Sequence, residues 1–234
     1  MKKNIYLLIL VLLCSCATAS IEDTQKSSAH YKLGVSYLNE NKVQPAFIEF
    51  QKALELNPYD KEVLNAIGII YLMKFEDFPK AIDFFQRAIK VDPVFSEGYN
   101  NLGVAYERSK NYNEAIASYK KAIANLLYRT PEKAYYNLGK VYYRLGQYDE
   151  ALDTFKEGLK RLADFYPAYY GIALCYNAKG KYGDASTAIT KAIEIDPLYK
   201  GDKGKAIYDL KQRKLQAKGD EEKEINDYLE ILKY

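Results

Sequence analysis

Apolar and polar residues alternate along this chain with the spacing of an amphipathic α-helix. In one segment Leu64, Ile67, Gly68 and Tyr71 fall at positions i, i+3, i+4 and i+7, so they share one face of a helix with about 3.6 residues per turn. Similar segments follow one another from residue 27 to residue 199, and turn-forming residues separate them. The pattern predicts an all-α chain built from helix pairs.

Two short motifs recur within these segments at an almost constant interval. In the first, an aliphatic residue precedes a glycine or alanine, and a tyrosine follows three positions later. The small residues are Gly34, Gly68, Gly103, Gly139 and Ala173, at intervals of 34, 35, 36 and 34 residues. In the second, an alanine precedes a large apolar residue by four positions; these alanines are Ala46, Ala81, Ala115, Ala151 and Ala185. Such a period indicates stacked repeats.

The recurring glycines have a physical explanation in close helix packing. A glycine inside a helix costs about 1 kcal/mol relative to alanine, so its recurrence indicates that a close approach of two helices outweighs this cost. The large ring one turn into the second helix would fill the space beside the glycine. We therefore expect Gly103→Leu to overpack the joint and to lower stability by about 1 to 3 kcal/mol or more.

These motifs resemble the tetratricopeptide repeat (TPR) family, whose repeat is a pair of helices of about 34 residues. The resemblance covers residues 27–199 and divides them into five repeats: 27–60, 61–95, 96–131, 132–165 and 166–199. It implies a right-handed superhelical solenoid of helix-turn-helix repeats, in which the first helices line a concave groove. Residues 200–234 are predicted to be a helical cap, a partly degenerate sixth pair; a solvated tail is the alternative for the last helix. Small insertions are expected near Phe75–Pro79 and at Leu126–Thr130.

The N-terminal residues have the features of an export signal. Lys2 and Lys3 precede an apolar run of nine residues, 5–13, which is too short for the roughly 20 residues that a membrane-spanning helix needs. We expect a signal peptide at 1–15. The sequence Leu13-Cys14-Ser15-Cys16 resembles the lipobox of bacterial lipoproteins, which implies that Cys16 is lipidated and anchors the chain to a membrane. The alternative is an ordinary cleaved signal peptide that ends in two cysteines.

If the lipobox resemblance holds, residues 16–26 form the lipidated cysteine and a polar tether. Ala17 stands where lipoproteins kept at the inner membrane tend to have aspartate. The resemblance thus implies an outer-membrane lipoprotein that faces the periplasm. Cys175 would be the only thiol of the mature fold, so no disulfide within the chain is expected.

Composition limits the chemistry that this chain can perform. Lys and Arg total 34 against 31 Asp and Glu, a net charge of +3, so no basic excess indicates nucleic-acid binding. The one histidine, His30, rules out sites that need two histidines within the chain, and it is expected to have a packing role. Gly201–Lys205 lacks the spacing of a phosphate-binding loop. We expect no enzyme activity, cofactor, metal or small-molecule substrate.

The repeat positions identify the residues expected to face the groove and contact a protein or peptide partner. They are Tyr31, Asn65, Asn100, Asn101, Lys133, Tyr136, Asn137, Lys140, Tyr143, Tyr170 and Asn177. Asn101 and Asn137 occupy equivalent places, where an amide can bond to a peptide backbone or, alternatively, contact the next helix. The basic clamp with which related repeats bind the acidic tails of chaperones is absent, since its positions hold Tyr31, Val35, Ala66, Glu97 and Asn101.

The whole arrangement resembles the pilotins of type IV pilus systems. A signal peptide, a lipobox, several repeats and the junction Leu127-Tyr128-Arg129-Thr130-Pro131-Glu132 carry this resemblance. It implies a partner in the secretin, the pilus exit pore, whose assembly in the outer membrane the protein would assist. The chain departs from that family in having five clear repeats rather than six. The alternatives are a general envelope adaptor that recruits cell-wall hydrolases or outer-membrane assembly factors and, less in keeping with the composition, an enzyme subunit.

Overall fold

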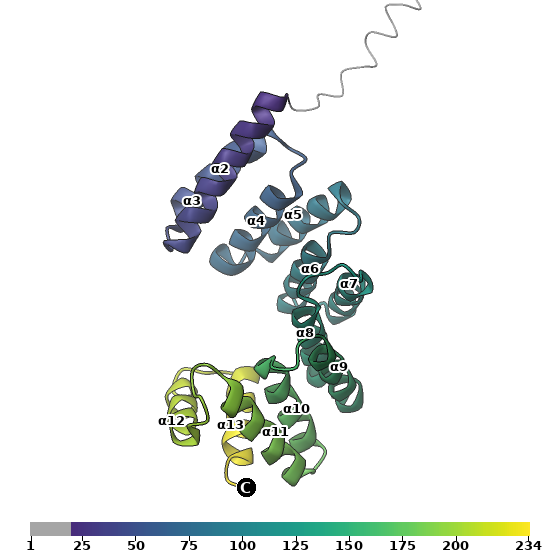
Figure 1. Ribbon diagram of the computed structural model, residues 1–234, viewed down its shortest axis with the longest axis vertical. Helices are drawn as coiled ribbons and strands as arrows, with labels where there is room; N and C mark the ends of the chain where they lie inside the picture. Colours follow the sequence, from purple (N-terminus) through teal and green to yellow (C-terminus); the bar gives the residue numbers. More distant parts are fainter. Residues whose placement is uncertain (1–19) are drawn as a thin grey trace, which may run out of the picture. The chain divides into compact units, whose positions relative to one another are not determined.

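The computed structural model describes residues 20–234, and these residues fold into helices (Figure 1). The described range holds twelve α-helices, α2 to α13, with one π-helical segment, η1, and no strand. The helices form two compact units, with the boundary between Asp92 and Pro93. The predicted all-α class is confirmed, and each unit is described separately below.

The first unit contains two helix pairs. Its elements are α2 (Ile21–Asn39), α3 (Val43–Leu56), α4 (Lys61–Ile70), η1 (Tyr71–Phe75) and α5 (Phe78–Val91). The Ser20 hydroxyl accepts a hydrogen bond from the Asp23 backbone N–H at 3.0 Å and so caps α2. Residues 21–26, which were expected to belong to a polar tether, are therefore helical, and the predicted repeat boundary at 27 falls inside α2.

The π-helical segment lies at the insertion that the repeat spacing predicts. The first helix of the second repeat changes from α to π geometry at Tyr71, and Glu76 then adopts a left-handed conformation with φ of 53°. Asp77 begins α5 by accepting a hydrogen bond from the Lys80 backbone N–H at 3.1 Å. The wider turn brings the Phe75 ring to 5.4 Å from the Phe47 ring and 5.5 Å from the Tyr71 ring. The extra residues thus build an aromatic cluster.

The second unit contains three helix pairs and two further helices. Its elements are α6 (Ser96–Arg108), α7 (Tyr112–Ala124), α8 (Pro131–Arg144), α9 (Tyr148–Arg161), α10 (Tyr166–Ala178), α11 (Tyr182–Ile195), α12 (Lys203–Lys214) and α13 (Asp220–Ile231). Helices α6, α8 and α10 pair with α7, α9 and α11, and α7 and α9 also pack against the first helix of the next pair. This alternation is the predicted helix-turn-helix repeat.

The glycine joints confirm the predicted close approach of paired helices. A Cβ atom added to Gly103 would lie 2.5 Å from the Cε1 atom of Tyr119, and one added to Gly68 would lie 2.6 Å from the Cε1 atom of Phe85. A Cβ atom added to Gly34 would meet the Phe50 ring in the same way, and one added to Gly139 would meet the Phe155 ring. All four rings are buried. Glycine recurs because these ring positions leave no room for a side chain.

The two C-terminal helices pack on the second unit rather than extending into solvent. Helix α13 lies beside α10 and α11 (Figure 1), and its Ile225 and Ile231 are 1% and 0% exposed. Its acidic and tyrosine side chains reach α8 and α10. The helix therefore covers part of the face of the first helices, whereas the sequence predicts a cap over the end of the stack.

Candidate functional site

In the first unit, the predicted groove residues form part of the packed framework. Tyr31 on α2 is half-buried, and its ring lies 5.7 Å from the ring of Phe50, the partner of Gly34. Asn65 on α4 is 4% exposed, so the structure does not present its amide to a partner. The half-buried residues Val35 on α2 and Ile69 on α4 give this face its apolar character.

The predicted amide contacts of the second unit lie between two helices. The Asn137 Nδ2 atom on α8 donates to the Asn100 Oδ1 atom on α6 at 3.1 Å, and Asn100 is 8% exposed. Asn137 thus contacts a neighbouring helix, as the alternative prediction has it, although this helix belongs to the preceding pair. Asn101 is half-buried on α6, while Lys133 is exposed at the start of α8. Lys133 is therefore the groove lysine most open to a partner.

A buried carboxylate in the second unit binds side chains from neighbouring helices. Glu107 on α6 is 8% exposed and accepts a hydrogen bond from the Tyr119 hydroxyl at 2.8 Å and one from the Arg144 guanidinium. The Lys140 Nζ atom lies 3.9 Å from the same carboxylate and 5.7 Å from the centre of the Tyr136 ring. Burial and the neighbouring Glu107 charge raise the pKa of Tyr119, which therefore remains protonated. Lys140 is held by these contacts.

Helix α13 covers the predicted groove tyrosines. The Tyr143 hydroxyl donates to the Asp227 Oδ2 atom at 3.3 Å, and the Tyr170 ring meets the Tyr228 ring edge-on at 5.5 Å. Tyr136 on α8 packs against α9, with its ring 5.8 Å from the Phe155 ring. Burial raises the pKa of its hydroxyl to about 12. The groove positions of α8 and α10 are thus occupied by the protein's own last helix.

Two polar atoms of this unit are buried without a hydrogen bond among the described residues. They are the Oδ1 atom of Asn177, at the end of α10, and the Nε atom of Arg144. The Asp220 carboxylate at the start of α13 lies 3.9 Å from that Nε atom. The repeat positions did not identify Arg144, because it lies one residue beyond the last position counted in its helix.

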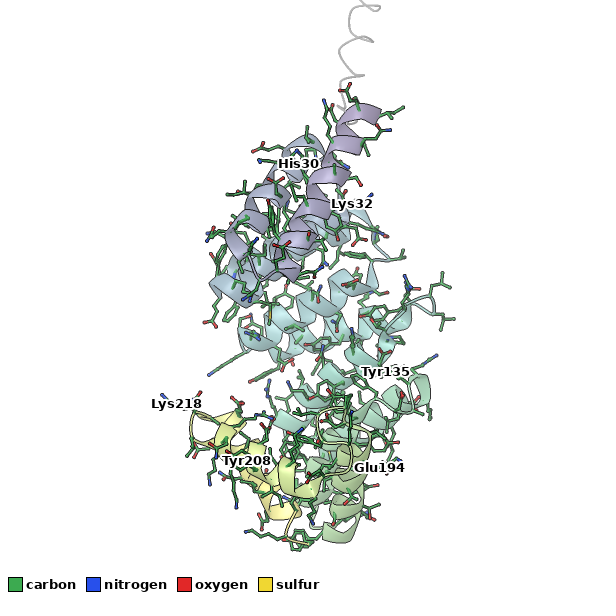
Figure 2. All side chains as sticks on the ribbon, turned by 60° about the vertical axis from the view of Figure 1, so that its left-hand side comes forward. His30, Lys32, Tyr135, Glu194, Tyr208 and Lys218 are labelled. Atoms are coloured by element: carbon green, nitrogen blue, oxygen red, sulfur yellow. The ribbon has the colours of Figure 1, made fainter. Side chains whose placement is uncertain are left out.

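The other singled-out side chains have structural surroundings. His30, labelled on α2 in Figure 2, places its Nδ1 atom 2.6 Å from the Glu49 Oε2 atom of α3, so it makes a hydrogen bond between paired helices where the sequence predicts a packing role. Cys175 is buried, and burial raises the pKa of its thiol to about 12, so the thiolate is scarce at neutral pH. Among residues 20–234, no cluster of His, Cys, Asp and Glu side chains could hold a metal ion.

The predicted signal peptide and the lipidated Cys16 lie outside the described residues. Within the described range, no helix combines the length and apolar character that crossing a bilayer requires.

Comparison with protein families identifies the repeats. Three models described as tetratricopeptide repeat match residues 27–60, 96–164 and 136–200. These ranges do not include residues 61–95, the repeat that contains the π-helical segment.

Curated relatives share parts of this sequence. The Type IV pilus assembly protein PilF of Pseudomonas aeruginosa is 26% identical to this chain over 136 residues. The match covers 54% of this chain and 52% of that protein. Anaphase-promoting complex subunit 3 of Schizosaccharomyces pombe is 33% identical over 107 residues, 46% of this chain and 13% of that protein. The chain thus spans about half of the first relative and a small part of the second.

Solved structures share the fold over most of the chain. The crystal structure of the MamA protein has 27% identity and a TM-score of 0.61, covering 74% of this chain and 92% of that one. PilW, described as a widely conserved type IV pilus biogenesis factor, has 23% identity and a TM-score of 0.71, covering 86% and 90%. The PilW likeness is evidence for the fold alone.

Proposed function

Because this chain is a tetratricopeptide repeat protein, a class that binds protein or peptide partners, we propose that it is a membrane-anchored scaffold that assists the outer-membrane targeting and assembly of a type IV pilus secretin. The lipid on Cys16 would hold the chain at the membrane, and the repeats would hold a secretin subunit there.

The observation that carries this proposal is the similarity to PilF of Pseudomonas aeruginosa, which extends through several repeats rather than one. The lipobox-like Leu13-Cys14-Ser15-Cys16 supports the anchor independently. A scaffold that is both anchored and able to hold a partner suits the delivery of an envelope component.

The loop between α7 and α8 offers a docking surface for that partner. Leu126 and Leu127 are each 86% exposed, and contiguous exposed apolar surface is typical of interaction sites. Asn125 orders the start of the loop: its Nδ2 atom donates to the Val94 carbonyl at 3.1 Å, and its Oδ1 atom accepts from the Leu127 N–H at 3.0 Å. The leucines are thus presented at the junction that resembles the pilotins.

The docking surface can be tested by capture of secretin from a detergent extract of the native envelope on the immobilised full chain. We expect the double substitution Leu126→Ser with Leu127→Ser to weaken capture at least tenfold, or about 1.4 kcal/mol, with an unchanged melting temperature. Leu215→Ser is the matched control, because Leu215 is 78% exposed at the end of α12. If the double variant captured as much secretin as the unsubstituted chain, secretin would contact another surface.

The anchor is tested separately by membrane fractionation. Cys16→Ser should release the protein from the membrane fraction, whereas Cys14→Ser should leave it attached. Deletion of the gene should reduce secretin multimers and surface pili. Unchanged multimers, together with capture of cell-wall hydrolases or barrel-assembly proteins, would replace the pilus role with that of a general envelope adaptor.

A further inference from the structure

The second unit contains a partly open cavity that is separate from the loop surface. Residues of α8, α10, α11, α12 and α13 line about 540 Å³ of space, which lies within the range of about 300 to 1,000 Å³ typical of ligand pockets. Its floor is apolar and includes Ile189, Ile193 and Leu210, which are 1%, 3% and 6% exposed. The cavity is large enough for a long side chain and part of the backbone that carries it.

Tyrosines form much of the wall. Five of them line the cavity: Tyr136, Tyr166, Tyr170, Tyr199 and Tyr228. Contacts between rings hold several in place, with Tyr170 edge-on to both Tyr166, at 6.3 Å, and Tyr228, at 5.5 Å. A ring face attracts a cation placed within about 6 Å of its centre, and desolvation strengthens this attraction.

Three carboxylates, those of Asp196, Asp209 and Glu224, also line the cavity. Neutral hydroxyl groups donate hydrogen bonds to two of these carboxylates. The Tyr170 hydroxyl donates to Asp196 at 3.3 Å, and the Tyr199 hydroxyl donates to Asp209 at 2.7 Å. These hydroxyl donors carry no charge that would neutralise the carboxylates.

Glu224 differs from the other two because its carboxylate makes no hydrogen bond or ion pair with any described residue. Burial raises its pKa, and the neighbouring charges of Lys140 and Arg144 oppose this rise. The one cationic side chain in the lining, Arg213, lies 3.5 Å from Glu221 outside the cavity. An anionic ligand would meet three carboxylates here, and a neutral apolar ligand would leave Glu224 without a partner.

We propose that this cavity binds a basic side chain of a protein partner, a lysine ammonium or an arginine guanidinium, with its charge against Glu224 and Asp196 and its methylene stem against the tyrosine rings. This inference rests on the proposed role as a protein-binding scaffold and adds the chemistry of the partner. The apolar floor suits the stem, while the carboxylates select the charge.

Capped pentapeptides that differ at one central residue provide the test. With the purified full chain, a peptide with lysine or arginine should bind saturably in a calorimetric titration, and its norleucine counterpart should bind at least tenfold more weakly. Equal binding of norleucine would overturn the proposal. Tighter binding of the free diamine cadaverine than of the lysine peptide would assign the cavity to a small amine instead and overturn the choice of a protein partner.

Variants identify the cavity as the site. Glu224→Gln should weaken binding of the lysine peptide at least fivefold, whereas Glu222→Gln should leave it unchanged, since Glu222 is exposed on the same helix. A Glu224→Gln protein that binds as the unsubstituted chain does would overturn the proposal. Peptide binding without capture of secretin would leave the cavity assignment standing and remove the pilus role.

Discussion

The two units of this protein build the same repeat joints but differ in what lies on their first helices. The first unit consists of two helix pairs alone, whereas the second adds α12 and α13, and α13 lies against α10. Groove positions that are equivalent in sequence therefore have different surroundings: Leu72, four residues after Gly68, is buried within its own unit, and Tyr143, four residues after Gly139, is bonded to Asp227 of α13. A repeat position alone does not establish that a residue is available to a partner.

The joints themselves also differ between the units. Phe50 and Phe85 fill the glycine joints of the first unit, whereas Tyr119 fills one in the second and donates to the buried Glu107. The phenylalanine rings of the former contribute only apolar contacts, whereas the Tyr119 hydroxyl adds a polar contact to the latter. Four changes test this comparison.

The largest effect is expected at the glycine joint of the second unit. Gly103→Leu places a side chain where Tyr119 leaves no room, so we expect the free energy of unfolding to fall by about 3 kcal/mol. Urea denaturation measures this loss. Gly183→Leu is the control, because nothing lies within 4 Å of a Cβ atom at Gly183 on α11. Leucine has a higher helix propensity than glycine, so a similar loss in both variants would show that the contact with Tyr119 is not its cause.

The next effect concerns the attachment of α13. Ile231→Ala removes a side chain that is 0% exposed, so we expect a loss of about 2 to 3 kcal/mol and faster hydrogen exchange in α13. Tyr208→Ala serves as the control, since Tyr208 is 66% exposed on the neighbouring helix α12 (Figure 2). Unchanged exchange in Ile231→Ala would mean that α13 is held mainly by its polar contacts.

A smaller effect should follow when the second-unit joint is made like those of the first. Tyr119→Phe removes the hydrogen bond to Glu107 but keeps the ring, so we expect a loss of about 1 kcal/mol in urea denaturation. The loss stays small because Arg144 and Lys140 still face the Glu107 carboxylate. A loss above about 3 kcal/mol would show that the hydroxyl supports the whole network.

The smallest effect is a pH dependence of opposite sign in the two units. Burial raises the pKa of Glu224 above its ordinary value of 4.5, so the folded protein binds this proton more tightly than the unfolded chain does. The stability contribution of Glu224 therefore falls as pH rises from the ordinary carboxyl range through its raised pKa. The facing charges of Lys140, Arg144, Asp220 and Glu107 are part of this balance.

Glu49 of the first unit behaves in the opposite way. Hydrogen bonds from Lys52 and His30 lower its pKa, so its contribution is present above the ordinary value of 4.5 and is lost as pH falls through the lowered one. We expect Glu224→Gln to raise stability at pH 7, because the uncharged amide is not penalised by burial, with little change for Glu222→Gln. Thermal denaturation from pH 7 down to a pH below the ordinary carboxyl range would measure both slopes. A Glu224→Gln protein with the unsubstituted slope would refute the assignment.

Much of the fold follows from the sequence, because a repeat of about 34 residues contains its own helix signals and packing partners. The spacing of Gly34, Gly68, Gly103 and Gly139 predicted the joints, and the extra residues near Phe75 predicted an insertion. The π geometry of that insertion was not predicted, since an added residue can be accommodated in several turn types.

The availability of the groove residues depended on contacts between distant parts of the chain. Tyr143 and Asp227 lie 84 positions apart, and the cavity is lined by residues from Tyr136 to Leu232. No short-range pattern specifies such pairings, because they depend on where α13 packs after the repeats have stacked. The sequence by itself thus determined the repeating helix pairs and their glycine joints, whereas only the tertiary structure decided which groove faces α13 covers and where the acidic, tyrosine-lined cavity forms.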